Sequence, residues 1–144
     1  MSIRTVGTII EGQELVSADA SLPVADAARL MRGHRVGAIL VVDGENLVGI
    51  FTERDALFRV VAEGRDPQST PIAHVMTANP TTISADKPFA RAMEIMHEGS
   101  FRHVPVVENG RPIGIVSSRD AMGPELEQFM YTLIVEEHTR DVLA

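Results

Sequence analysis

The sequence predicts an α/β (α+β) fold in which two copies of one β-α-β-β-α unit are followed by an extra C-terminal helix. A shift of 65 residues aligns positions 16–57 with 81–122 without a gap, and 12 of the 42 aligned pairs are identical. In each copy, apolar residues first recur at helical spacing and then form two apolar runs separated by a turn. The chain of 144 residues is long enough to bury its own core. We therefore expect two similar units inside one compact domain.

The first part of each unit is expected to be a short extended segment followed by a helix. In the first copy the extended segment is 15–17, Ser21 is the expected helix N-cap, and Pro23 stands in the opening turn. Apolar residues then recur at helical spacing as far as Met31, before Gly33. The second copy has an extended segment at 81–83 and repeats the helix with Asp86, Pro88, Phe89, Ala92, Met93, Met96 and Gly99.

The second part of each unit is expected to be a β-hairpin followed by a second helix. The two strands of the first copy are expected at 38–42 and 47–51. The second copy places Asn109 and Gly110 in its turn, and this pair is the strongest short hairpin signal. Each sheet is then expected to carry its helices on one side. The second helices are expected to begin near Glu53, with an end at Glu63 and Gly64, and near Ser118.

The expected organisation is a first repeat at 5–63, a linker at 64–71, a second repeat at 72–122 and an amphipathic C-terminal helix at 123–144. The linker contains two prolines and one glycine, which are typical of a loop. The pair Gly123-Pro124 is expected to break the last helix of the second repeat. The C-terminal helix is expected to have one apolar stripe that needs a packing partner, formed by Leu126, Phe129, Met130, Leu133 and Ile134.

Composition excludes several classes of protein. The absence of cysteine excludes disulfides, thiolate zinc sites and cysteine nucleophiles. A net charge of −7 and only 4% aromatic residues argue against nucleic acid as a partner. The sequence has no apolar run long enough to span a membrane, and its first residues lack the features of a signal peptide. We therefore expect a cytoplasmic protein with no membrane partner.

The most informative motif follows the third strand of each copy and reads G-h-h-[ST]-x-R-D, where h is apolar. Its simplest interpretation is a helix capping box, in which a hydroxyl and a carboxylate three residues later accept hydrogen bonds from backbone N–H groups. The same set also suits a ribose phosphate, because arginine binds phosphate and an ionised aspartate accepts from vicinal hydroxyls. Both copies keep Arg-Asp while neighbouring letters differ, which favours the second interpretation. The motif residues are Thr52, Arg54, Asp55, Ser117, Arg119 and Asp120.

The duplication, the order of elements and two longer motifs resemble a tandem pair of cystathionine-β-synthase (CBS) domains. The motifs are V-V-D-G…G-I-F-T-x-x-D in the first copy and F-R-H-V-P-V-V…G-I-V-S-x-x-D in the second. The resemblance extends from about Thr5 to Met122. It implies that the repeats pack sheet to sheet with pseudo-two-fold symmetry and leave two clefts for adenine nucleotides or related adenosyl ligands.

The resemblance also implies roles for individual residues. Asp55 and Asp120 would hold ribose hydroxyls, while Thr52, Arg54, Ser117 and Arg119 would meet phosphate. The two clefts are expected to differ, because Gly37-Ala38 stand where the second copy has Arg102-His103, which gives the second copy the more polar mouth. By backbone position, the adenine pocket would use Val16, Ser17, Gly37, Ala38, Thr82, Ile83, His103, Val104 and Pro105.

The leading functional hypothesis is a non-catalytic regulatory sensor that binds AMP, ADP or ATP and signals to an unknown effector protein. NAD(H) and S-adenosylmethionine are alternative ligands for such a pair. An enzyme that hydrolyses a nucleotide is disfavoured, because the sequence has no P-loop, no nucleophile motif and no histidine spacing typical of a metal site. A structural dimer with empty clefts is the third hypothesis. The resemblance also implies a homodimer, to which the C-terminal helix is expected to contribute.

Overall fold

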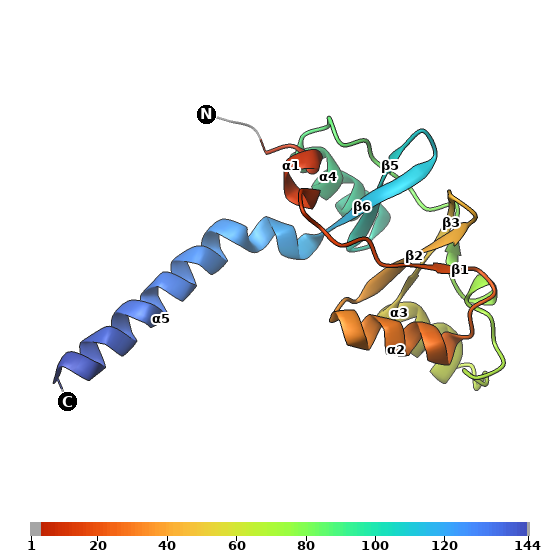
Figure 1. Cartoon of the computed structure of the whole chain (residues 1–144), viewed down its shortest axis with the longest axis horizontal. Coiled ribbons are helices and arrows are strands. Elements are labelled where there is room, and N and C mark those ends of the chain that lie inside the picture. Colours follow the sequence, from red (N-terminus) through yellow and green to blue (C-terminus); the bar gives the residue numbers. More distant parts are fainter. Residues whose placement is uncertain (1–3, 144) are drawn as a thin grey trace.

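The computed structural model describes residues 4–143, apart from the side chains of residues 124–130. The first half of the chain contains α1 (Val6–Ile10), β1 (Ser17–Asp19), α2 (Val24–His34), β2 (Ala38–Asp43), β3 (Asn46–Thr52), α3 (Glu53–Asp55) and the π-helical turn η1 (Ala56–Val61). The second half contains the 3-10 turn η2 (Ile72–His74), β4 (Thr77–Ala78), α4 (Phe89–Gly99), β5 (His103–Glu108), β6 (Arg111–Ser117), the 3-10 turn η3 (Ser118–Met122) and α5 (Gly123–Leu143). The α/β (α+β) class and the extra C-terminal helix are confirmed (Figure 1).

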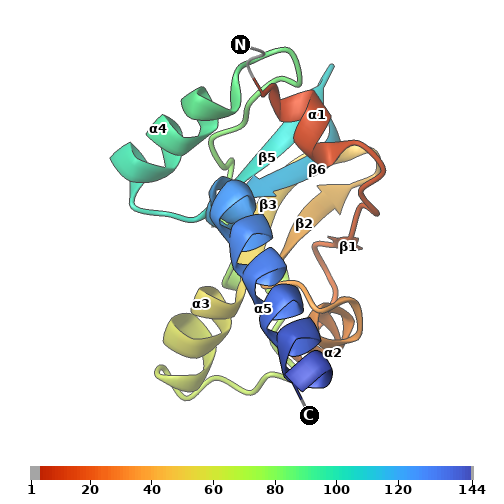
Figure 2. The same cartoon turned by 90° about the vertical axis from the view of Figure 1, so that its left-hand side faces the viewer.

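The strands form a four-stranded sheet in the order β1-β2-β3-β4 and a two-stranded sheet of β5 and β6. Strand β1 runs parallel to β2, and Ala18 lies opposite Val41. At the equivalent place in the second repeat, Ile83 forms a parallel bridge with Val106. The extended segment expected at 81–83 therefore pairs through one residue and is not a full strand. Figure 2 shows the strands of both sheets between α1 and α4 at one end and α2 and α3 at the other.

The two β-hairpins have equivalent registers, as the repeat predicts. Leu40 pairs with Ile50 in the first hairpin, and Pro105 pairs with Ile115 in the second. Each hairpin also has a register shift at its two consecutive valines. Asn109 has a φ of 54° and Gly110 a φ of 79°, which are the left-handed values that a tight two-residue turn requires.

The expected N-cap at Ser21 is wrong. The backbone N–H and the hydroxyl of Ser21 both donate to Asp19 Oδ1, at 2.9 and 2.6 Å. These hydrogen bonds stabilise the turn that precedes the helix. Helix α2 begins after Pro23 without a side-chain cap. The second repeat behaves in the same way, because Asp86 accepts from the Ser84 hydroxyl and α4 begins after Pro88.

The expected helix break at Gly123-Pro124 is also wrong. Gly123 has right-handed helical angles, φ −52° and ψ −56°, and η3 leads directly into α5. Proline is tolerated in the first turn of a helix, because an N–H there has no intrahelical acceptor. Helix α5 then projects away from both sheets (Figure 1).

The apolar stripe expected on α5 falls only partly on described side chains. The side chains of Leu126, Phe129 and Met130 lie outside the described part of the chain. Leu133 and Ile134 are described, and they are 40% and 61% exposed. Among the described residues, no helix combines the length and the hydropathy needed to cross a bilayer.

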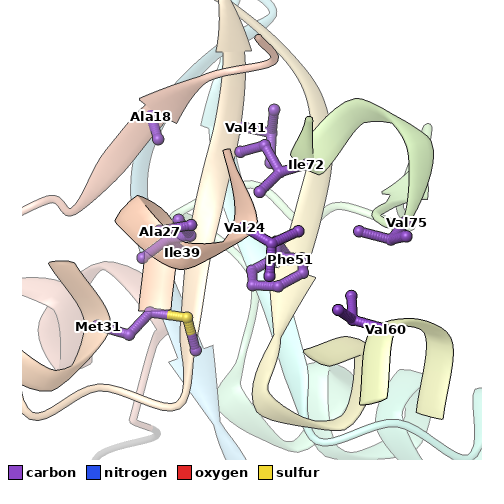
Figure 3. Packing of buried hydrophobic residues seen from close by; sticks show 10 residues of the cluster. All are labelled: Ala18, Val24, Ala27, Met31, Ile39, Val41, Phe51, Val60, Ile72 and Val75. Atoms are coloured by element: carbon purple, nitrogen blue, oxygen red, sulfur yellow. The ribbon is translucent and has the colours of Figure 1, made fainter. Parts of the chain in front are cut away.

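The repeats have separate hydrophobic cores that exchange their short leading helical turns. The core of the first repeat includes Ile72 and Val75, which follow the linker (Figure 3). The core of the second repeat includes Val6, which precedes the first repeat's β1. Packing therefore crosses the boundaries expected at 5–63, 64–71 and 72–122, and those boundaries stay predictions.

The exchange has equivalent backbone hydrogen bonds on its two sides. The Gly7 N–H donates to the Ala85 carbonyl at 2.8 Å, and the Ala73 N–H donates to the Ala20 carbonyl at 3.0 Å. Ala20 and Ala85 are equivalent positions of the repeat. The exchange thus follows the pseudo-two-fold relation between the repeats.

Direct contacts also hold the two repeats against each other. Leu40 and Ile50 form a small buried cluster on which Ile115 of the second repeat packs. The Gln13 side chain pairs with the backbone of Ile115, accepting from its N–H at 2.8 Å and donating to its carbonyl at 2.9 Å. At the hairpin ends, Arg111 and Glu45 form an ion pair of 2.7 Å. These contacts fix the relative position of the repeats, which sets the geometry of any cleft between them.

Candidate functional site

Both copies of the G-h-h-[ST]-x-R-D motif form helix capping boxes. The Asp55 N–H donates to Thr52 Oγ1 at 3.2 Å, and the Thr52 N–H donates to Asp55 Oδ2 at 3.0 Å. In the second repeat, the Ser117 N–H donates to Asp120 Oδ2 at 2.8 Å. The capping interpretation is therefore correct for both motifs, and any ligand role comes in addition to it.

The first motif lines a cavity of about 950 Å³ to which both repeats contribute. This volume is near the upper end of the range for small-ligand pockets, about 300–1,000 Å³. Of the residues predicted from the sequence, Thr52, Arg54, Asp55 and His103 meet around it. The remaining lining residues are Ile50, Glu53, Leu57, Phe58, Arg59, Thr77, Asn79, Pro80, Thr81, Gly99, Phe101 and Arg102.

Most of the other predicted site residues lie elsewhere. Ser17 lines a second, smaller cavity of about 240 Å³ near the hairpin ends. Gly37 is covered by Glu53, whose Oε1 lies 3.1 Å from the place that a Cβ on Gly37 would take. Four of the predicted residues are buried in the protein: Ala38, Ile83, Val104 and Pro105. The residues outside the 950 Å³ cavity are Val16, Ser17, Gly37, Ala38, Thr82, Ile83, Val104, Pro105, Ser117, Arg119 and Asp120, and their ligand roles stay predictions.

Sequence reasoning missed several polar residues of the cavity. Arg59 lies one helical turn after Asp55, a spacing that would have placed both on one face. Glu53 lies inside the first motif at its variable position. Arg102 is the counterpart of Gly37 in the repeat, and the sequence predicts no ligand role for it. The signals were present, but bringing these residues together needs the packing of one repeat on the other.

The Asp55 carboxylate is a central group of the cavity and is nearly surrounded by donors. Its Oδ1 lies 3.5 Å from Arg59 Nε, and its Oδ2 accepts from Thr52. Arg59 also donates to the carbonyls of Val75 and Met76, at 3.3 and 2.9 Å. Asp55 and Arg59 therefore connect the motif of the first repeat to the segment that leads into β4, whose Thr77 lines the same cavity.

The surroundings of His103 in the cavity shift the pKa of its imidazole. Burial lowers the pKa of His103 below its usual value of 6.5, and the nearby Arg102 lowers it further. Glu53 and Asp120 oppose the shift, because their negative charges favour the protonated ring. The imidazole is therefore mainly neutral at pH 7, when it carries one N–H donor and one acceptor.

We expect the free energy of unfolding to fall as the pH drops below 6.5, the usual pKa of His103, through a contribution from this residue. The pKa of this residue is lower in the folded protein than in the unfolded chain, so the unfolded chain binds the proton first. The contribution is complete above pH 6.5 and is lost as the pH falls below that value. Urea unfolding at several pH values should show a weaker pH dependence in His103→Gln. His97→Gln, at an exposed position of α4, should keep the original dependence, and equal behaviour of the two variants would contradict this prediction.

The described residues include no group of three His, Asp or Glu side chains placed to hold a metal ion. The polar groups of the cavity are instead hydroxyls, carboxylates, guanidinium groups and one imidazole. Such a set can accept hydrogen bonds from sugar hydroxyls and donate to anionic oxygens.

Comparison with known proteins identifies both repeats. A family model described as "CBS domain" matches residues 6–62 and again residues 72–123. The CBS domain-containing protein CBSCBSPB2 of Arabidopsis thaliana is 44% identical over 94 residues, which cover 65% of this chain and 18% of that protein. The chain thus spans less than one fifth of the length of this curated relative.

Solved structures of other proteins share the fold over most of the chain. A protein with CBS domains from Burkholderia ambifaria has a TM-score of 0.76 and 34% identity, covering 81% of this chain and 89% of that one. A CBS domain protein of Pyrobaculum aerophilum complexed with AMP has a TM-score of 0.75 and 26% identity, covering 86% and 98%. The CBS domain pair of protein MJ0100, in complex with 5′-methylthioadenosine and S-adenosyl-L-methionine, has a TM-score of 0.78 and 26% identity, covering 88% and 99%.

The two segments matched by the family model cover more than half of the chain. They coincide with the two units seen in the structure, each with its hairpin and its leading helix. The resemblance inferred from the duplicated motifs is therefore confirmed. This chain belongs to the family of CBS-domain proteins and carries two CBS domains in tandem.

Proposed function

We propose that this protein is a non-catalytic regulatory module that binds an adenine nucleotide (AMP, ADP or ATP) in the 950 Å³ cavity between its repeats. One observation carries the proposal. Thr52, Arg54 and Asp55 of the first repeat line the same cavity as Arg102 and His103 of the second. A ligand in this cavity contacts both repeats, so its binding stabilises one relative arrangement of them.

The chemistry of the cavity matches the parts of a nucleotide. Ile50, Phe58, Pro80 and Phe101 supply apolar and aromatic surface for a planar base. Asp55 supplies carboxylate oxygens for ribose hydroxyls, of which Oδ1 is the freer, since its nearest donor is Arg59 Nε at 3.5 Å. The guanidinium groups can bind phosphate oxygens in the bidentate geometry that arginine favours.

The ligands of related structures support the adenosine part of this proposal. AMP is bound in the Pyrobaculum aerophilum protein, and 5′-methylthioadenosine and S-adenosylmethionine are bound in MJ0100. These three molecules share the adenosine group and differ in what is attached to its 5′ position. An effector protein would sense the arrangement of the repeats that the ligand stabilises.

Asp55→Asn is expected to weaken the binding of AMP, ADP and ATP about tenfold or more, measured by isothermal titration calorimetry. The amide keeps the size of the side chain but loses the charge and one acceptor for the ribose hydroxyls. The matching 2′-deoxynucleotides should bind the unchanged protein more weakly, because one hydroxyl partner is missing. Equal binding of the ribose and deoxyribose forms would contradict the role of Asp55.

Asp120→Asn is the comparison variant in the second capping box, where Asp120 occupies the equivalent position but does not line the 950 Å³ cavity. It should retain most of the affinity. The same titrations with NAD and S-adenosylmethionine test the alternative ligands, and tighter binding of either one than of any adenine nucleotide would replace the nucleotide in this proposal.

We also propose that the protein forms a homodimer to which α5 contributes. Leu133 and Ile134 are exposed on a helix that projects from the body of the protomer (Figure 1). Tyr131, Val135 and Val142 are exposed on the same helix. Large exposed apolar areas are unusual on monomers and mark interaction surfaces, and symmetric pairs are the commonest oligomers.

A further inference from the structure

We propose that the cavity selects an adenine nucleotide with a polyphosphate chain, and that Arg54 and Arg102, one from each repeat, hold that chain. This inference rests on the proposed function and narrows its ligand to ADP or ATP. It predicts weaker binding of AMP and of adenosyl compounds that carry no phosphate.

The first step concerns which charged groups of the cavity are already paired with each other. Three guanidinium groups line it, from Arg54, Arg59 and Arg102, together with the carboxylates of Glu53 and Asp55. Arg59 is committed to Asp55 and to two backbone carbonyls. The positive charge of Arg59 and the negative charge of the Asp55 carboxylate therefore largely compensate each other within the first repeat.

The second step concerns the two arginines that remain. The guanidinium groups of Arg54 and Arg102 form no ion pair or hydrogen bond with any group in the described part of the chain. The guanidinium carbon of Arg54 lies 5.5 Å from the centre of the Phe58 ring, which keeps its N–H groups available at the ring's face. Two arginines without an anionic partner in one cavity are notable in a chain with 20 acidic and 13 basic residues.

Glu53 does not cancel the charge of these two arginines. Its carboxylate lies against the backbone at Gly37, with Oε1 at 3.1 Å from the place of a Cβ there. One carboxylate also leaves an excess of one positive charge when it is set against two guanidinium groups. The part of the cavity that lies outside the Asp55 and Arg59 pair is therefore positive, although the whole chain is negative.

The third step concerns the size and charge of the ligand. One arginine can bind a single phosphate group through two parallel hydrogen bonds. Arg54 lies in α3 of the first repeat, whereas Arg102 directly precedes β5 of the second, so an anion that binds both must offer oxygens to both repeats. A chain of two or three phosphates meets this requirement. The positive sulfonium of S-adenosylmethionine does not, because it is repelled by the same guanidinium groups.

Isothermal titration calorimetry of the full chain at one fixed salt concentration tests the inference with adenosine, AMP, ADP and ATP. The affinity should rise about tenfold or more from AMP to ATP. Arg54→Ala and Arg102→Ala should each lower the affinity for ATP by a similar factor and leave the affinity for adenosine unchanged. Arg54 and Arg102 are both exposed, so these variants should fold normally. Arg65→Ala, an exposed linker position outside the cavity, should bind every ligand like the unchanged protein.

The outcomes separate this inference from the proposed function. If AMP and ATP bind equally well and Arg102→Ala has no effect, the polyphosphate inference is wrong and the nucleotide module stands. If adenosine, AMP, ADP and ATP all fail to bind, the proposed function itself is wrong. Inorganic tripolyphosphate is the last probe, and it should bind more weakly than ATP. Binding as tight as that of ATP would show that the base and ribose contribute nothing, which would contradict the nucleotide in both proposals.

Discussion

Phe51→Ala is expected to lower the free energy of unfolding by about 3–5 kcal/mol, which is the usual cost of removing a buried phenyl ring. Phe51 is completely buried among the residues of the first core, beside Val24 in Figure 3. Because α2, β2 and η2 all contribute to this core, the ring's removal leaves a cavity that no single side chain can fill. Domains of this size have a total stability of about 5–15 kcal/mol, so the variant should be close to unfolding at 37 °C.

Val116→Ala is the matched variant in the second repeat, where Val116 occupies the equivalent position and is also completely buried. It removes only two methyl groups, so we expect a loss of about 2 kcal/mol. Urea unfolding followed by circular dichroism measures both changes. A larger loss for Val116→Ala than for Phe51→Ala would show that the ring is not the main filler of its core.

Removal of residues 124–144 is expected to change the protein from a dimer to a monomer. The truncation deletes nearly all of α5, including the exposed Leu133 and Ile134, and keeps both cores and the 950 Å³ cavity. Light scattering coupled to size exclusion should give twice the protomer mass for the full chain and the mass of one protomer for the truncated chain. Nucleotide binding should persist in the truncated chain, which would show that it has folded.

A single charge on α5 tests the same surface without a truncation. Ile134→Glu should weaken the dimer strongly, because the carboxylate loses water when the surface is covered. Glu136→Gln, an exposed residue of the same helix, should leave the dimer intact. A full-length chain that is monomeric at micromolar concentration would contradict the proposed homodimer.

Local patterns were enough to predict the elements that depend on local physics. The β-branched runs around Asn109 and Gly110 predict a hairpin because the turn residues and strand residues agree with each other. The pattern failed at Ser21, where Asp19 competes successfully for the serine's N–H and hydroxyl. It also failed at Gly123, because a glycine followed by proline fits a helix start as well as a helix end.

The candidate site was only half predictable, because it is assembled from both repeats. A recognisable motif is formed by Thr52, Arg54 and Asp55, because they lie close together in the sequence. Arg102 lies far from them in the chain, and only the packing of the second repeat on the first brings it to the same cavity. The symmetry of the motifs suggested equivalent roles for Asp55 and Asp120, whereas the cavity contains only the first of them.

The crossed packing of α1 and η2 has a consequence for how such a protein can arise. The turn that begins each sequence copy completes the other copy's core, through Val6 on one side and Ile72 on the other. A chain with one copy would have an unfilled place in its core and an unattached helical turn. Two such chains can satisfy both needs by swapping their turns, as domain-swapped dimers do. Duplication and fusion of the gene would then convert an intermolecular swap into an intramolecular one, and the pair of repeats would be the smallest unit in which both cores are filled.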